Sequence, residues 1–128
     1  MTATGTFHGN LARDPELSFT KDGKPIANFT VCTSERRLDK NSGQWSDVDV
    51  SFWNCSAFGP LAENICESCE KGTPVIVTGR VKIENWVDKE GQKRQTPKVT
   101  AEDVAVSLRF KKASVSHNGS RQEQEAPF

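Results

Sequence analysis

The segment 48–58 could present two aromatic rings on one exposed face. Side chains alternate between the two faces of a β-strand, so one face would carry Phe52, Asn54, Ser56 and Phe58. The opposite face would carry Trp53, Cys55 and Ala57, and we expect Trp53 to fill the core or a subunit interface. Rings that stand among polar side chains are suited to stacking on flat groups such as nucleobases.

The segment 75–86 would add cations and an indole to such a surface. Its apolar face holds Val75, Val77, Val81 and Ile83, which leaves Thr78, Arg80, Lys82 and Trp86 on the other face. Unpaired bases expose their flat faces beside a charged backbone, so rings interleaved with Arg and Lys match single-stranded nucleic acid. The alternation of side chains along the strands also allows the alternative that Phe52 and Phe58 are core residues and Trp86 caps a hairpin.

Strands and one helix would position these segments. Residues 26–34 alternate as a strand and follow Asp22-Gly23, a hairpin turn signal. Between the two long strands, Leu61, Ile65 and Cys69 form a helical stripe, with Pro60 suited to the first turn and Gly72 to the end. A last strand runs through Val99, and Pro97 makes it an edge strand or one with a bulge. This order predicts an all-β fold, a five-stranded OB-fold Greek-key barrel with one helix between strands 3 and 4.

The composition fits one small domain with no net charge. The chain has 128 residues, 34% of them hydrophobic, with 17 basic and 17 acidic side chains. No apolar run approaches the roughly 18 residues that a membrane helix needs. Because the whole chain is neutral, any basic binding surface must be local, with acidic side chains elsewhere.

The N-terminus has neither a secretory signal nor a transit-peptide pattern, so we expect a cytoplasmic protein. Four cysteines lie at positions 32, 55, 66 and 69, and we interpret them as reduced structural thiols. His8 and His117 lie far in sequence from Cys66 and Cys69, so we expect neither a metal nor another cofactor. A thiol-redox enzyme built on the Cys66–Cys69 pair is an alternative, although Cys66 lies in the second helical turn. No nucleophile, acid–base pair or phosphate loop is recognisable, and we predict that the chain is not an enzyme.

From Gly9 to Phe110 an ordered set of short motifs resembles the bacterial single-stranded DNA-binding protein family. The motifs are Gly9-Asn10-Leu11, Asp14-Pro15-Glu16-Leu17, Ala27-Asn28-Phe29-Thr30-Val31, Phe52-Trp53-Asn54-Cys55, Ala62-Glu63-Asn64, the stretch 71–80 and the stretch 86–94. The Phe-Trp-x-Cys element and Ser107-Leu108-Arg109-Phe110 are most similar to the actinobacterial branch. A single motif of this kind is weak, but their common order is specific.

The resemblance implies a nucleoid-associated homotetramer that binds single-stranded DNA without sequence preference and protects it during replication, recombination and repair. Phe52, Phe58 and Trp86 match the family's stacking aromatics. Arg80, Lys82, Lys71, Lys93 and Arg94 match its basic face, and Arg36 and Arg37 lie in its mobile loop. Many relatives have a stacking Trp in that loop, so either Arg37 stacks in its place or this platform is missing. An OB-fold module for RNA or for replication-restart complexes is the alternative.

The chain divides into a binding domain, residues 1–110, and a tail, residues 111–128, that we expect to be disordered. The last residues, 123–128, resemble the acidic tip with which the family recruits replication and repair proteins. In that mode Phe128, preceded by Pro127, would fill an apolar pocket while a basic rim holds the nearby acids. The tip has only two acids, Glu123 and Glu125, so we predict weak partner binding.

Overall fold

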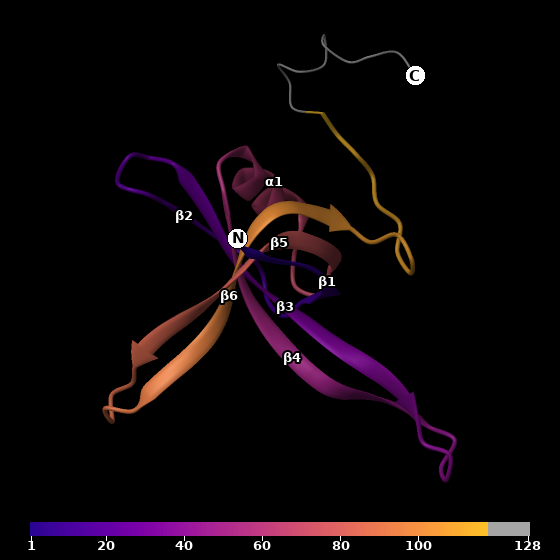
Figure 1. The fold of residues 1–128 in the computed structure, drawn as a ribbon. Coiled ribbons are helices and arrows are strands. Elements are labelled where there is room, and N and C mark those ends of the chain that lie inside the picture. The colour runs from indigo at the N-terminus through magenta and orange to yellow at the C-terminus, as the bar shows by residue number, and fades with distance from the viewer. Residues whose placement is uncertain (118–128) are drawn as a thin grey trace.

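A closed barrel of long strands with one helix forms the body of the protein (Figure 1). The computed structural model describes residues 1–117. Its elements are β1 (Ala3–Leu11), β2 (Glu16–Phe19), β3 (Pro25–Leu38), β4 (Trp45–Phe58), α1 (Pro60–Ser68), β5 (Pro74–Val87) and β6 (Lys93–Val106). The strand order is β1-β5-β6-β4-β3-β2, and a further β1–β3 pairing closes the barrel. The predicted OB-fold class is confirmed, with the short strand β2 added beside β3 and the helix between the third and fourth long strands.

The core consists of the inward-facing residues of the long strands. Val31, Val75, Val77 and Val99 are fully buried, as are Cys55 and Ala57 on β4. Trp53 is half-buried, and its ring lies 4.8 Å from that of Phe7 between centroids. The predicted alternation along β4 and the inner half of β5 is therefore confirmed, and Trp53 packs against the core.

Helix α1 packs against one end of the barrel and buries Ala62 and Ile65. Pro60 stands in its first turn, as the sequence predicts. The helix ends at Ser68 and not at Gly72, because Cys69 is extended and donates its amide to the Ile65 carbonyl. The next residues turn toward β5, and the amide of Gly72 donates to the Leu11 carbonyl at 2.8 Å. The predicted helix end was thus one turn too late.

Two hairpin arms extend from the barrel, β3–β4 and β5–β6 (Figure 1). They meet where β4 and β6 pair in parallel, from Asn54↔Lys98 to Ser56↔Thr100. Pro97 lies just beyond this pairing, where β5 is the only strand paired with β6 in the described part of the chain. β6 lies between β5 and β4, so it is not an edge strand. It does contain a bulge, because Glu102 is an extra residue between the pairs Thr78↔Asp103 and Gly79↔Ala101, and the bulge alternative is therefore confirmed. The β3–β4 arm has a bulge in β4 between Val48 and Ser51, opposite Ser34 of β3, and within it Asp49 has a φ of 54°.

After β6, residues 107–117 form neither helix nor strand, and the proposed tail tip lies outside the described residues. The boundary at residue 110 stays a prediction. None of the helices in residues 1–117 is long and apolar enough to cross a membrane.

Gly79 lets β5 and β6 approach closely at the barrel bend. The register of the two strands shifts between Thr78 and Gly79, and a Cβ at Gly79 would collide with the carbonyl oxygen of Thr100. That obstacle is backbone, so it cannot move aside without distorting the strand. At Gly5, which pairs with Gly79, a Cβ would meet side chains and no backbone: the Phe7 ring at 3.1 Å and Val81 Cγ2 at 3.8 Å.

We therefore expect Gly79→Ala to lower the free energy of unfolding by about 1–3 kcal/mol, the usual range for overpacking. Gly5→Ala is the matched control, and its loss should be smaller because a side chain can shift by a few tenths of an ångström. Thermal and urea unfolding followed by circular dichroism measures both. Equal stability of the Gly79→Ala variant and the wild type would contradict this close approach.

Candidate nucleic-acid interface

Strand register builds one continuous outer face from four strands. Side chains of directly paired residues lie on the same face of a sheet. The pairs Thr30↔Asn54, Asn54↔Lys98 and Lys82↔Lys98 link β3, β4, β6 and β5 in this way. The outer face holds Asn28, Thr30 and Cys32; Phe52, Asn54, Ser56 and Phe58; Arg94, Thr96, Lys98 and Thr100; and Arg80, Lys82, Glu84 and Trp86.

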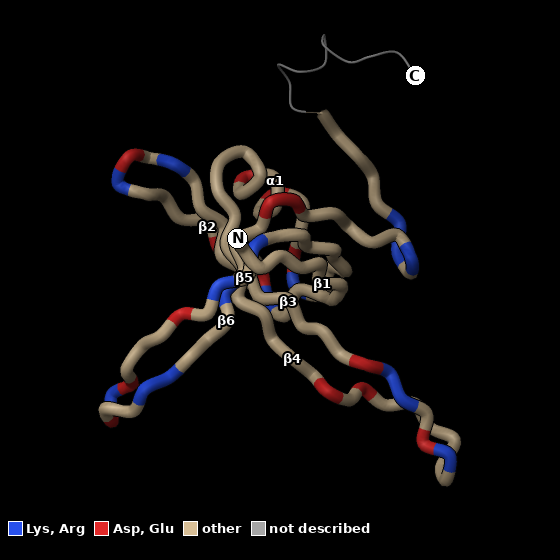
Figure 2. Tube along the Cα trace, in the orientation of Figure 1, with Lys and Arg blue, Asp and Glu red and all other residues tan. Residues whose placement is uncertain are grey.

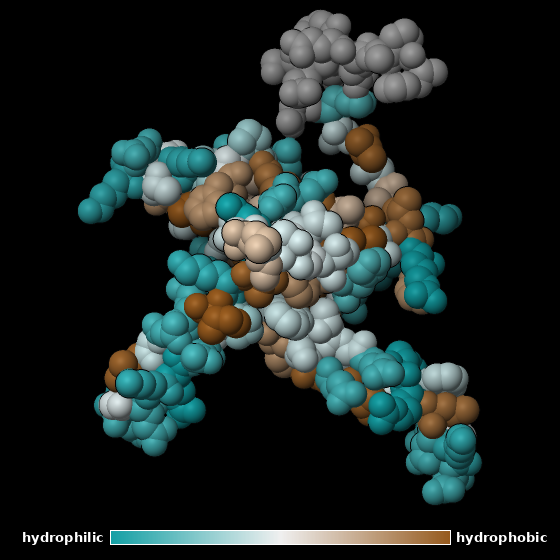
Figure 3. Space-filling view, viewed as in Figure 1, coloured by the Kyte–Doolittle hydropathy of each residue, from teal (hydrophilic) through white to brown (hydrophobic). Residues whose placement is uncertain are grey.

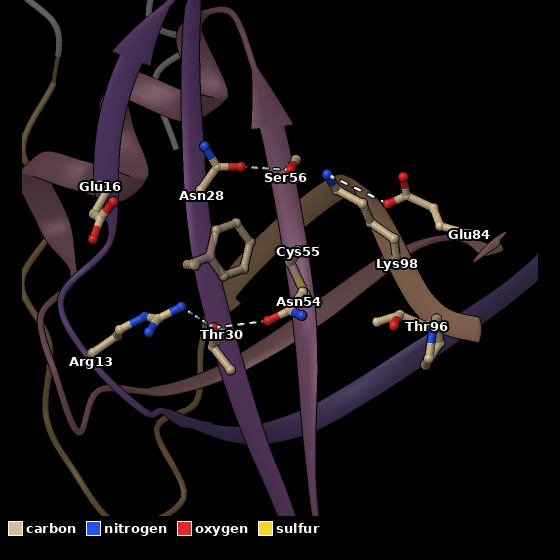
Figure 4. Close-up of a pocket in the computed structure, with 12 residues that line it drawn as sticks. Arg13, Glu16, Asn28, Thr30, Asn54, Cys55, Ser56, Glu84, Thr96 and Lys98 are labelled. Atoms are coloured by element: carbon tan, nitrogen blue, oxygen red, sulfur yellow. Dashed lines mark hydrogen bonds and ion pairs between the residues drawn. The ribbon is translucent and has the colours of Figure 1, made fainter. Parts of the chain in front are cut away.

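A polar cleft of about 300 Å³ lies at the centre of this face, where the arms meet (Figure 4). Ser56 donates its hydroxyl to Asn28 Oδ1 at 2.8 Å, and Thr30 donates to Asn54 Oδ1 at 3.2 Å. Arg13 Nη2 donates to Thr30 Oγ1 at 3.3 Å. These bonds satisfy the buried hydroxyls and leave the NH₂ groups of both asparagines as donors. The cleft can therefore bind oxygen acceptors such as those of phosphates and bases.

The three predicted stacking rings lie on the outer face and are open to solvent. Phe52 is 62% exposed, Phe58 42% and Trp86 49%, so the alternative that the two phenylalanines are core residues is wrong. Trp86 Nε1 donates to Thr96 Oγ1 at 2.8 Å, which holds the indole on its hairpin while half of it stays exposed. Lys24 Nζ lies 5.8 Å from the centre of the Phe58 ring.

The structure brings only some of the predicted cations to this face. Arg80, Lys82 and Arg94 lie on it. Arg36 and Arg37 lie in strand β3, so their predicted placement in a loop is wrong. Arg36 continues the outer face along the β3–β4 arm, because it lies on the same side of β3 as Thr30 and Cys32. Arg37 and Lys93 lie on the other face of their arms. Lys71 is in the turn after α1, where its amide donates to Asp14 Oδ1 at 2.7 Å.

Several of these cations already face a carboxylate. Basic and acidic residues are mixed along both arms (Figure 2). The nitrogen–oxygen distances are 3.7 Å for Arg80–Glu102, 3.8 Å for Arg36–Asp47 and 3.7 Å for Arg37–Glu35. Exposed pairs of this kind contribute about 0–1 kcal/mol, so a phosphate can replace the carboxylate. Lys71, Lys82 and Lys93 have no carboxylate within 4 Å in residues 1–117.

Arg94 is held more firmly than the other cations. Its Nε lies 2.9 Å from Asp88 Oδ2, and Asp88 Oδ1 accepts the amides of Glu90 and Gln92. The hydrogen bond from the Gln92 amide and that from Arg94 keep the pKa of Asp88 below its usual value. This network orders the turn of the β5–β6 arm beside Trp86.

Comparison with known proteins agrees with this geometry. Residues 3–107 match the family model described as the single-strand binding protein family. The chain belongs to this family. It is 42% identical over 113 residues to a single-stranded DNA-binding protein of Mycolicibacterium smegmatis, covering 88% of this chain and 68% of the relative. A protein of the same name from Paenarthrobacter aurescens is 40% identical over 123 residues, covering 96% of this chain and 72% of the relative.

A solved structure also has this fold. The crystal structure of the small single-stranded DNA-binding protein from Streptomyces coelicolor superposes with a TM-score of 0.73 at 28% identity. The match covers 84% of this chain and 95% of that one. The predicted family and its actinobacterial branch are thus confirmed.

In this family member, sequence reasoning missed part of the cleft. Asn28 and Thr30 were detectable, because they alternate with the core residues Ala27 and Phe29 along one strand. Arg13 gave no signal, since it lies outside any strand and its contact with Thr30 spans 17 residues. Lys98 was hidden next to Pro97, although it lies directly opposite Lys82.

In this family member, the pKa values of Cys55, Cys66 and Cys69 are raised, which is the opposite of what thiol-redox chemistry needs. Burial raises the pKa of Cys55 to about 12. Burial also raises the pKa of Cys66 and Cys69, with smaller contributions from Glu67 and from Cys66 respectively. Reactive thiols need a lowered pKa, so the redox interpretation loses its support. Among residues 1–117, no group of three or more His, Cys, Asp or Glu side chains could hold a metal ion.

We expect Cys55, Cys66 and Cys69 to react with iodoacetamide at pH 7.5 more slowly than free cysteine, with Cys55 the slowest. A raised pKa leaves less thiolate at neutral pH, so the rates should continue to rise above pH 8.5, the ordinary value. Peptide mapping by mass spectrometry measures each site, and urea-unfolded protein gives the reference rates. Reaction of Cys66 or Cys69 faster than free cysteine at pH 7.5 would show that its pKa is lowered.

Proposed function

We propose that this chain binds single-stranded DNA without sequence preference, stacking bases on Phe52, Phe58 and Trp86. One observation carries the proposal: the three rings are exposed beside a polar cleft, on the outer face that the paired strands share. Relatives that share about 40% of the sequence bear the name single-stranded DNA-binding protein, which supports it.

The energetics of stacking suit a protein with no net charge. Each stacked base contributes about 1–3 kcal/mol, and every base has a flat face, so stacking is strong and tolerant of sequence. Of the cations on the same face, Lys82 has no carboxylate within 4 Å in residues 1–117, whereas Arg80, Lys98 and Arg94 pair with Glu102, Glu84 and Asp88. Lys82 can therefore bind a phosphate directly, and the exposed pairs of Arg80 and Lys98 can exchange their carboxylates for phosphates. In duplex DNA the base faces are covered by their neighbours, which favours single strands.

We further propose that the protein acts as a homotetramer in the cytoplasm, on the nucleoid, where it protects single strands during replication, recombination and repair. Residues 1–110 would form the binding domain, and the tail 111–128 would contact replication and repair proteins through Pro127 and Phe128. Membership of the family and the likeness of residues 123–128 to its acidic tip support this assignment.

Titration with oligo(dT), followed by tryptophan emission, tests the proposed activity. Strong quenching and tight binding are expected, with much weaker binding to a duplex of the same length. A matched oligo(U) separates the alternative of an RNA module. Preference for the RNA or for the duplex would overturn the proposal.

Trp86→Ala should weaken oligo(dT) binding by about 1–3 kcal/mol, the contribution of one stacked base. Val87→Ala is the matched control, because Val87 is 63% exposed on the same arm but has the opposite parity. Fluorescence anisotropy of a labelled oligonucleotide measures both variants. Equal affinities of the two variants would contradict stacking at Trp86.

Lys82→Ala should reduce the salt dependence of binding. Each phosphate contact contributes a slope of about 0.7 in log affinity against log salt concentration for single strands. A loss of about that size is expected for Lys82→Ala, while Lys93→Ala, on the other face of the same arm, should keep the wild-type slope. Affinities measured from 50 mM to 400 mM NaCl test the difference, and the reverse pattern would place the phosphates on the other face.

A further inference from the structure

The tip of the β3–β4 arm presents a third tryptophan that the sequence pattern did not single out. Trp45 is the first residue of β4 and is 59% exposed. It pairs with Leu38, the last residue of β3, which is 44% exposed. Trp53 and Trp86 each donate their indole N–H to a threonine, but no residue within the described range accepts one from Trp45.

A strand bulge determines the direction of this ring. Counted by simple alternation along β4, Trp45 would share the face of Trp53 and lie opposite Phe52. At the bulge, however, the single residue Ser34 of β3 lies opposite two residues of β4, Asp49 and Val50. β4 thus has one residue more than β3 at this point. A bulge adds one residue to its strand and reverses the alternation beyond it. Past Asp49, the odd-numbered residues of β4 therefore join the face of Phe52.

The contacts on the arm agree with this assignment. Arg36 and Leu38 continue the face of Cys32 along β3, and they pair with Asp47 and Trp45. Arg36 Nε lies 3.8 Å from Asp47 Oδ1, as expected for neighbours on one face. Arg37 belongs to the other face, where its guanidinium lies 3.7 Å from Glu35 and 3.9 Å from Asp49.

The turn next to Trp45 is ordered by its own hydrogen bonds. The Asp39 amide donates to the Gln44 carbonyl and the Gly43 amide to the Asp39 carbonyl, both at 2.8 Å. Asp39 Oδ1 accepts the Asn41 amide at 2.9 Å. The indole therefore stands on a closed hairpin end, and less conformational freedom is lost when a ligand covers it.

We propose that Trp45, with Arg36 beside it, forms an additional base-stacking platform that extends the single-stranded DNA path from Phe52 along the arm. The proposal rests on the proposed function and adds a binding position to it. At about 3.3 Å per strand residue, Trp45 lies roughly 20 Å from Phe52 along the arm. An indole and a guanidinium on one exposed face match a base and its phosphate. Figure 3 shows mainly hydrophilic residues over this arm, with isolated hydrophobic ones between them.

The test compares oligo(dT) of increasing length on full-length wild-type protein and on Trp45→Ala and Trp45→Phe. Binding of the longer oligonucleotides should weaken about fivefold to a hundredfold in Trp45→Ala, the range for one stacked base. Binding of the shortest ones that still bind should stay unchanged, and Trp45→Phe should keep most of the affinity. Wild-type affinity of Trp45→Ala at every length would overturn the proposal.

A swap variant controls for composition and for the direction of the ring. Trp45→Ser combined with Ser46→Trp keeps the indole on the arm but moves it to the face of Arg37. We expect it to bind like Trp45→Ala, and recovery of wild-type affinity would contradict the assigned face. The assembly mass should be equal in all variants; a change of mass in Trp45→Ala would assign Trp45 to a contact between copies and overturn the proposal.

Fluorescence separates this inference from the proposed function. In Trp86→Phe, oligo(dT) should still quench part of the emission, and the further change Trp45→Phe should remove that part. If the wild type does not bind oligo(dT), the proposed function itself fails. If the wild type binds but oligo(dT) quenches the emission of Trp86→Phe and of the double variant equally, only the platform at Trp45 fails.

Discussion

The parallel pairing of β4 with β6 is the constraint on which the rest of the structure depends. It spans only three residue pairs, from Asn54↔Lys98 to Ser56↔Thr100. This short pairing joins the edges of two hairpins that are far apart in the sequence, and it so creates one outer face. Beyond these pairs each hairpin continues alone as an arm. Gly79 supports the same junction from β5, because its missing Cβ leaves room for the Thr100 carbonyl.

This geometry explains how a neutral chain can present a surface for a polyanion. The cations of the outer face and of the arms stand mainly in exposed pairs with carboxylates, at 3.7–3.9 Å, and such pairs contribute little stability. Exchanging a carboxylate for a phosphate therefore costs little. The rings supply affinity that does not depend on charge, and the polar cleft supplies donors for oxygen atoms. The neutral composition and a local binding surface are compatible for these reasons.

Sequence reasoning predicted the features that depend on regular alternation. From Phe52 to Phe58 the strand is regular, so parity separated the exposed rings from Cys55 and Ala57 correctly. The predicted strand began at residue 48, whereas β4 begins at Trp45, so Trp45 was not considered. Simple alternation would also have placed it on the wrong face, because the bulge at Asp49 reverses the alternation before it. The end of α1 was misplaced because a long-range hydrogen bond, from Gly72 to Leu11, takes up the last predicted turn. Partners such as Glu102 for Arg80 depend on strand register, which local patterns do not contain.

Photocrosslinking of oligo(dT) that contains 5-iododeoxyuridine, followed by peptide mapping, tests most directly whether bases lie on the outer face. The iodinated base couples to aromatic side chains on which it stacks. The structure predicts crosslinks at Phe52, Phe58 and Trp86, all on the face formed by β4, β5 and β6. Crosslinks confined to rings elsewhere on the surface, such as Phe19 on β2 or Phe110 after β6, would contradict the account.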